Sequence, residues 1–153
     1  MRTILFVCTG NTCRSPMAEA IARNLLDKGS VDGVSERVFV ASAGTHASAG
    51  SPISGEAAAA LRRNGIEHDG LSRHLTAAMI RRADLVLGMT SGHVAAARAL
   101  VDADPDQAAK IHPMDEHGDI DDPIGLGRQA YDRLAAQFAE LLPKRIAELL
   151  RPT

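Results

Sequence analysis

One stretch near the amino terminus decides the fold: Val7-Cys8-Thr9-Gly10-Asn11-Thr12-Cys13-Arg14-Ser15-Pro16. The apolar run at residues 3–7 before it is typical of a buried parallel strand. Ser15 and Pro16 begin a helical pattern, with proline at its first position. The stretch is therefore predicted to be a loop that joins a strand to a helix.

The residue types in this loop predict an anion site with a nucleophile in its floor. Backbone N–H groups between Cys8 and Arg14 can point inward, and the positive end of the following helix adds to their field. Such a field favours the thiolate form of a cysteine, and Arg14 can donate two parallel hydrogen bonds to phosphoryl oxygens. Gly10 and Asn11 tolerate left-handed backbone conformations, and the Asn11 side chain is expected to pin the loop. We therefore expect Cys8 to attack phosphorus in line.

Each fragment of this motif also occurs in proteins of other classes. A lone cysteine is often a packing residue, and a glycine turn between a strand and a helix is found in many nucleotide-binding domains. A dinucleotide site would need the pattern G-x-G-x-x-G and an acidic residue after the second strand. The chain has neither in this loop or after the strand predicted at residues 38–42. The combination of a thiol, a small-residue loop and an arginine therefore favours a nucleophile.

At these residues the chain resembles the low-molecular-weight protein tyrosine phosphatase family, whose signature is C-x-x-x-x-x-R-S at the first strand-to-helix turn. The resemblance runs nearly end to end and includes Ser42-Ala43-Gly44, residues 83–90 and Asp122-Pro123. It implies one flavodoxin-like α/β domain over residues 1–153, with a parallel sheet and helices on both faces. It also implies a phosphocysteine mechanism in which Cys8, Arg14 and Asp122 are catalytic. The expected phosphate- and substrate-binding residues are Thr9, Gly10, Asn11, Thr12, Cys13 and Ser15.

Asp122 lies in an acidic segment, residues 119–127, that also contains a proline and two glycines. By the resemblance, its carboxylic acid protonates the leaving group, and its carboxylate then removes a proton from the water that hydrolyses phosphocysteine. Asp119 and Asp121 are expected to be solvated and to cap the next helix.

Composition and charge narrow the function classes. The chain has 153 residues, is 45% hydrophobic and 24% charged, and carries a formal net charge of −2. These values are ordinary for one globular domain, and the net charge does not indicate binding to nucleic acid or to an anionic membrane. No apolar stretch is long enough to span a membrane, and Met1 leads directly into a core strand without a signal region. We expect a cytoplasmic monomer that acts on phosphorylated proteins.

Cysteine and histidine usage predicts neither a metal nor a cofactor. Two cysteines cannot form a disulfide framework, and the histidines are scattered without paired ligand spacing. Cys13 has two open interpretations, a small packing residue or a redox partner that captures oxidised Cys8 in a disulfide.

Strands and helices alternate along the chain. Strands are predicted at residues 3–7, 38–42, 84–89 and 110–114. Helices are predicted at residues 15–28, 54–64, 76–82, 91–101 and 126–150, the last kinked or interrupted at Pro143. The alternation predicts a parallel sheet with its site at the carboxyl ends of the strands, where residues 43–51 form the second active-site loop of the family.

The substrate is less well defined than the reaction. Phosphotyrosine sites of this family usually place aromatic side chains beside the loop and after Asp-Pro, where this chain has Ala47 and Ile124. At Thr12 the chain resembles the bacterial protein arginine phosphatase branch, which carries threonine where many tyrosine phosphatases have an apolar residue. A hydroxyl can accept a hydrogen bond from a guanidinium, whereas an aliphatic side chain would leave that donor unpaired at a cost of about 1–3 kcal/mol. Phosphoarginine is the favoured substrate, and phosphotyrosine is the alternative.

Other functions fit parts of the sequence less well. An arsenate reductase would need further thiols, and no cysteine follows Cys13. A non-catalytic phosphoprotein-binding module has no need of a nucleophile and a general acid together, and a flavodoxin-like carrier would bind a nucleotide without turnover. Many family members also have a histidine before the third helix that ties down the loop. Gly70 stands there in this chain, and His68 or His74 is an open substitute.

Overall fold

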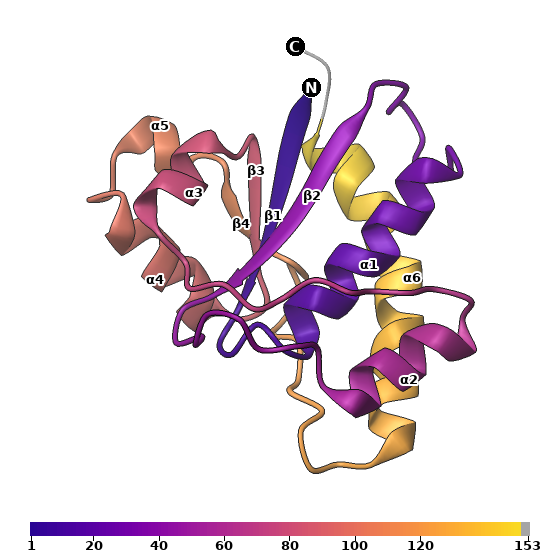
Figure 1. Ribbon diagram of the computed structural model, residues 1–153. Coiled ribbons are helices and arrows are strands. Elements are labelled where there is room, and N and C mark those ends of the chain that lie inside the picture. The colour runs from indigo at the N-terminus through magenta and orange to yellow at the C-terminus, as the bar shows by residue number, and fades with distance from the viewer. Residues whose placement is uncertain (151–153) are drawn as a thin grey trace.

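The computed structural model describes residues 1–150 and contains a four-stranded parallel sheet with the order β2-β1-β3-β4. The strands are β1 (Arg2–Cys8), β2 (Val38–Gly44), β3 (Leu85–Gly88) and β4 (Ile111–Pro113). The strand β1 pairs in parallel with β2 and β3, and β3 pairs in parallel with β4. The carboxyl ends of all four strands therefore lie at one edge of the sheet (Figure 1). The predicted parallel α/β sheet is confirmed.

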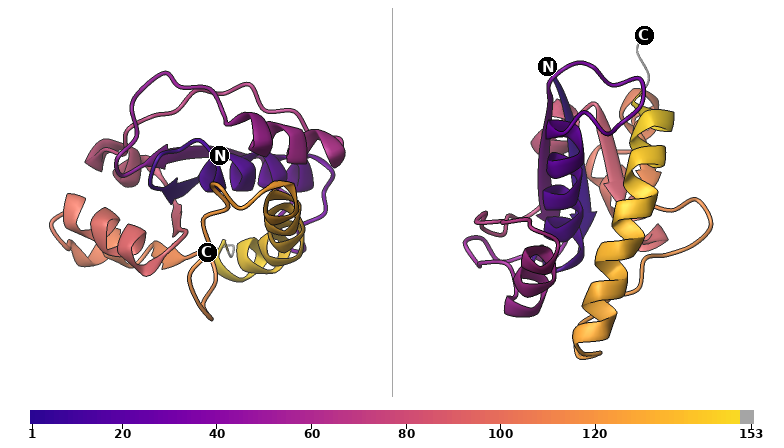
Figure 2. Two further views of the ribbon diagram at one scale, coloured as in Figure 1. Left: turned by 90° about the horizontal axis from the view of Figure 1, so that it is seen from below. Right: turned by 90° about the vertical axis from the view of Figure 1, so that its right-hand side faces the viewer.

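The helices form two layers around this sheet (Figures 1 and 2). One layer contains α1 (Arg14–Asp27), α2 (Gly55–Arg63) and α6 (Arg128–Leu149), and the other contains α3 (Ala77–Arg82), α4 (Ser91–Leu100) and the short α5 (Pro105–Ala108). None of the described helices combines the length and the apolar character needed to cross a membrane.

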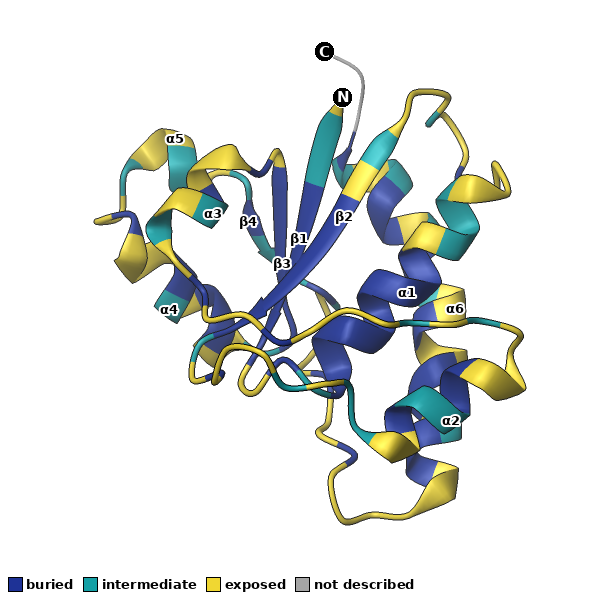
Figure 3. Ribbon diagram, in the orientation of Figure 1, coloured by how far each residue is buried: buried dark blue, intermediate teal, exposed yellow. Residues whose placement is uncertain are grey.

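Alternation along β1 supplies both cores. Ile4, Phe6 and Cys8 face the cluster under α1 and α6, whereas Leu5 and Val7 face the cluster under α3 and α4. Side chains of a strand point to opposite faces in turn, so a central strand with both faces covered is apolar throughout. Figure 3 shows the buried residues along the strands of the sheet and in the amino-terminal half of α1.

The predicted elements are all present, and their ends are displaced by at most two residues. The helix α1 begins at Arg14, so Pro16 is its third residue rather than its first. The difference costs no hydrogen bond, because the first four N–H groups of a helix have no intrahelical partner. The short helix α5 was not predicted, and it begins at Pro105 with the Asp104 side chain as its cap.

Pro143 does not interrupt the last helix, because α6 continues from Arg128 to Leu149. Proline removes one N–H, whose acceptor would be the carbonyl of Ala139 four residues earlier. Ala139 is exposed, so water can satisfy that carbonyl. Phe138, Leu142 and Ile146 on the opposite side are fully buried and hold the helix against the core on both sides of the proline.

Candidate active site

The loop between β1 and α1, residues 8–14, lies at the carboxyl edge of the sheet, and we call it the anion loop. Cys13 precedes the first turn of α1, and its side chain makes no capping bond to the helix. Backbone N–H groups without a hydrogen-bond acceptor among residues 1–150 gather here, on Gly10, Thr12, Cys13, Arg14 and Ser15. Consecutive free N–H groups at a helix N-terminus form a binding site for an anion.

The thiol of Cys8 is only 3% exposed and is surrounded by hydrogen-bond donors. Its Sγ accepts a hydrogen bond from the backbone N–H of Asn11 at 3.3 Å and lies 2.8 Å from Oγ of Ser15. The Ser15 oxygen itself accepts a bond from the Asn11 side-chain amide at 2.8 Å, which leaves the hydroxyl hydrogen for the sulfur. These donors stabilise a thiolate.

Asn11 fixes the shape of the anion loop. Its φ of 57° is left-handed, a conformation that asparagine tolerates better than most residues. Besides bonding Ser15, its amide donates to Oγ of Ser42 at 2.9 Å, and its Oδ1 accepts the backbone N–H of Arg73 at 2.9 Å. The expectation that this side chain pins the loop is confirmed.

Glu19 extends this network below the loop. The Ser42 hydroxyl donates to Oε1 of Glu19 at 2.7 Å, and Arg23 donates to Oε2 at 2.7 Å. His68 Nδ1 lies 3.6 Å from the same carboxylate, with its side chain 5% exposed. His68 thus lies beside Glu19, which supports the anion loop, and not beside the Cys8 thiol. His74 is exposed, and only its backbone bridges to Gly44.

Gly44 permits the close approach of residues 43–51 to the anion loop. It pairs with Cys8 in the sheet, and a Cβ built on it would lie 2.4 Å from the carbonyl oxygen of Thr9 and 3.0 Å from the backbone nitrogen of Asn11. Both atoms belong to backbone that the network above holds in place, so neither can move cheaply.

Replacement of Gly44 by alanine is therefore expected to destabilise the protein by about 1–3 kcal/mol, the usual cost of overpacking. Urea unfolding of the variant and the wild type measures the difference. Gly55→Ala is the matched control, because a Cβ there meets no atom within 4 Å and the position is helical. Equal stability of the two variants would contradict the close approach at Gly44.

Arg14 connects the anion loop to the acidic segment 119–127. Its side chain is 8% exposed, donates through Nη1 to the carbonyl of Ile120 at 3.0 Å, and places Nη2 3.7 Å from Oδ2 of Asp122. The Asp122 side chain is 44% exposed and also accepts the backbone N–H of Ile124 at 3.1 Å. The structure thus brings the acidic segment over the anion loop, at the rim of the site.

The other acidic residues of this segment have different positions. Asp119 accepts the backbone N–H of Ser91 at 2.9 Å and so caps α4. The expectation that it caps the following helix is wrong, because α6 begins after Gly127 without a side-chain cap. Asp121 is exposed, as expected.

Cys13 points away from the solvent, into a polar corner between α2 and α6. It is 6% exposed, donates from Sγ to Oγ of Ser54 at 3.3 Å, and lies 3.7 Å from the Tyr131 hydroxyl. Burial and the neighbouring thiol raise the pKa of Tyr131 to about 12. Both cysteines are free thiols.

Among the residues at the anion loop that sequence reasoning missed are Tyr131 and His93. Nε2 of His93 lies 2.8 Å from Oγ1 of Thr9. The sequence pattern places Tyr131 only on the apolar face of α6, and it places His93 only near the start of a helix. Neither position carries a signal of contact with a loop some 80 to 120 residues earlier.

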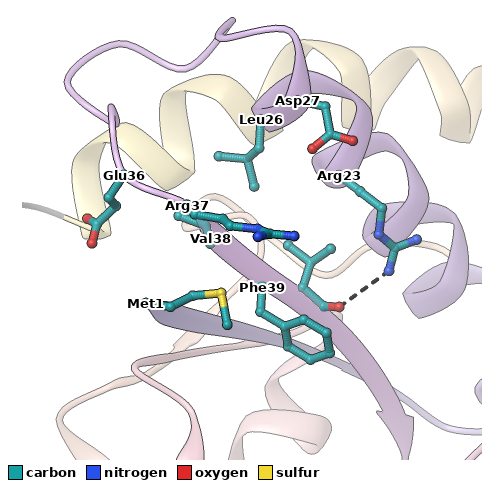
Figure 4. A pocket seen from close by; sticks show the side chains of 9 residues that line it. Met1, Arg23, Leu26, Asp27, Glu36, Arg37, Val38 and Phe39 are labelled. Carbon is teal, nitrogen blue, oxygen red and sulfur yellow. Dashed lines mark hydrogen bonds between the residues drawn. The ribbon is translucent and has the colours of Figure 1, made fainter.

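Among residues 1–150, no aromatic side chain stands beside the Cys8 thiol at the two positions where phosphotyrosine sites of the family stack an aryl ring. Ala47 is buried, and Ile124 is 61% exposed. The one exposed aromatic residue described, Phe39, lies near the amino-terminal end of β2, where it lines a pocket of about 480 Å³ with Met1 and Arg23 (Figure 4). This pocket is therefore at the opposite end of β2 from the anion loop.

The Cys8 thiol, the free N–H groups of the anion loop and the Arg14 guanidinium lie together, which is the arrangement that in-line attack of a thiolate on phosphorus requires. This arrangement places the protein in the class of cysteine-dependent phosphatases. More closely, the chain belongs to the low molecular weight phosphotyrosine protein phosphatase family, whose model matches residues 3–152.

Relatives with two different substrates share this scaffold. The chain is 40% identical to a protein-arginine-phosphatase of Geobacillus stearothermophilus, covering 97% of this chain and 95% of that protein. It is 34% identical to a low molecular weight protein-tyrosine-phosphatase of Streptomyces coelicolor, with 84% and 82% covered. Among solved structures, the YwlE arginine phosphatase with serine at its active-site cysteine, phosphorylated on that serine, has a TM-score of 0.82 at 32% identity, with 94% and 95% covered.

Proposed function

We propose that the protein removes the phosphoryl group from phosphoarginine residues of other proteins, and that Cys8, Arg14 and Asp122 carry out the reaction. The free N–H groups of the anion loop and Arg14 hold the phosphoryl oxygens while the Cys8 thiolate attacks phosphorus. The bond from phosphorus to the guanidinium nitrogen breaks as Asp122 supplies a proton to that nitrogen. The product of this step is phosphocysteine.

Hydrolysis of phosphocysteine completes the cycle. The Asp122 carboxylate removes a proton from a water molecule, the water oxygen bonds to phosphorus, and the bond from phosphorus to sulfur breaks. Inorganic phosphate leaves, and the sulfur departs as the thiolate that the Asn11 N–H and the Ser15 hydroxyl stabilise. All of these groups belong to one chain and the cycle needs no cofactor. We propose that the enzyme acts as a monomer in the cytoplasm, where a nucleophilic thiol stays reduced.

The Thr12 side chain carries the choice of substrate. It is half-buried in the anion loop, and its hydroxyl has no hydrogen-bond partner within residues 1–150. A free acceptor beside the phosphoryl group suits a guanidinium, which presents only donors. The missing aromatic wall at Ala47 and Ile124 disfavours an aryl group, and the similarity to the Geobacillus enzyme supports the same choice. Similarity to the Streptomyces enzyme keeps phosphotyrosine as the second candidate.

Replacement of Thr12 by isoleucine is expected to lower kcat/KM for phosphoarginine peptides and to preserve or raise it for phosphotyrosine peptides. One unpaired donor is worth about 1–3 kcal/mol, so the preference should shift by roughly one to two orders of magnitude. The measurement is the ratio of the two kcat/KM values on peptides of matched sequence.

Thr12→Ser is the control, because it keeps the hydroxyl and should keep the preference of the wild type. A wild type that prefers phosphotyrosine, or an unchanged ratio in Thr12→Ile, would contradict phosphoarginine as the substrate and favour phosphotyrosine.

A further inference from the structure

His93 joins the start of α4 to the anion loop through its two ring nitrogens. It is the third residue of α4 and is 6% exposed. On one side, Nδ1 accepts the backbone N–H of Thr90 at 3.1 Å, in a reciprocal cap that also bonds the Thr90 hydroxyl to the His93 N–H. On the other side, Nε2 lies 2.8 Å from Oγ1 of Thr9.

These contacts define which nitrogen carries the proton. A backbone N–H can only donate, so Nδ1 must be the acceptor and Nε2 of the neutral ring bears the hydrogen. Nε2 therefore donates to Oγ1 of Thr9. Because that oxygen has no other hydrogen-bond partner among the described residues, the Thr9 hydroxyl hydrogen stays available to an acceptor.

The charges around the ring are consistent with the neutral form. Burial lowers the pKa of His93 below 6.5, and the Arg14 guanidinium lowers it further. Among the other groups that face the ring, Asp119 and Asp122 raise this pKa and His46 lowers it. The net effect is a lowered pKa of His93, so the ring is neutral at pH 7.

Thr9 directly follows the nucleophile and is held at two points. Its carbonyl accepts the backbone N–H of His46 at 2.9 Å, and its hydroxyl accepts the His93 hydrogen. We propose that His93 is a positioning residue for phosphate binding, which orients Thr9 so that the Thr9 hydroxyl donates to a phosphoryl oxygen in the anion loop. The inference rests on the anion-binding role proposed for this loop and does not depend on which phosphorylated residue is the substrate.

Two substitutions at position 93 separate the contact to Thr9 from the helix cap. Asparagine places an acceptor near the Nδ1 position and keeps the cap, but it cannot reach Thr9. Glutamine places an N–H near the Nε2 position. We expect His93→Asn to weaken competitive inhibition by inorganic phosphate roughly three- to tenfold, the range for one lost hydrogen bond, and His93→Gln to restore it to within about twofold of the wild type.

A double-mutant cycle with Thr9→Val tests whether the effect passes through Thr9. In the Thr9→Val background, His93→Asn should cause no further loss of phosphate affinity, and thermal unfolding of each variant reports on the cap independently. Additive losses, or glutamine no better than asparagine, would overturn the positioning role. Failure of the wild type to bind phosphate at all would instead contradict the proposed function and, with it, this role.

Discussion

Replacement of Cys8 by serine is expected to reduce turnover by more than about a thousandfold while phosphate and vanadate still bind, because the anion loop keeps its N–H groups and Arg14. The serine oxygen would receive the same hydrogen bonds from Asn11 and Ser15. A hydroxyl is not ionised near neutral pH, however, so attack on phosphorus slows and release of phosphate from a serine ester slows further.

The variant is therefore also expected to accumulate phosphate on the new serine; the active-site serine of the solved YwlE variant is phosphorylated. Intact-protein mass spectrometry after incubation with substrate measures the added phosphoryl group, and inhibition of the wild type by vanadate calibrates the binding assay. Turnover of Cys8→Ser near the wild-type rate would exclude a covalent mechanism through this residue.

Asp122→Asn should slow hydrolysis by about 10²–10⁴-fold for substrates with strongly basic leaving groups and much less for an activated phenyl phosphate. Asp122 lies at the rim with its carboxyl group 3.7 Å from Arg14, and in the proposed reaction this group protonates the departing atom. A good leaving group needs no proton, so the comparison isolates the general acid from any effect on the shape of the site.

The measurement is kcat for both substrate types with the wild type, Asp122→Asn and Asp121→Asn. The neighbouring aspartate is exposed and touches no group of the anion loop, so its amide variant should resemble the wild type on both substrates. Equal losses on the two substrates in Asp122→Asn would show that Asp122 shapes the site without donating a proton.

The anion loop was predictable from sequence because its chemistry is local. Cys8, Asn11 and Arg14 lie within one strand-to-helix turn, and a turn has few ways to arrange a thiol and a guanidinium. Asp122 lies more than a hundred residues away, so only the family resemblance could assign it to this site. The contact of Ile120 and Asp122 with Arg14 is a product of the tertiary fold.

The remaining site residues depend on contacts that no local pattern reports. His93 caps its own helix through Nδ1 and contacts Thr9 through Nε2, and Asp119 caps a helix that precedes it in the chain. Pro143 shows the same limit for the fold, because its effect depends on which side of α6 faces water. Propensity describes a residue in isolation, and these outcomes depend on its neighbours in space.

The hydrogen bonds of Asn11 have an evolutionary consequence. The curvature of the anion loop is set from behind by Ser15, Ser42 and the backbone of Arg73, none of which contacts the leaving group in the proposed reaction. Thr12, by contrast, contributes no side-chain bond to that scaffold within the described residues. Substitutions at position 12 can therefore occur without breaking the hydrogen bonds that shape the anion loop. If Thr12 selects the substrate as proposed, the residues that shape the loop can be inherited unchanged while position 12 alone diverges with the phosphorylated residue.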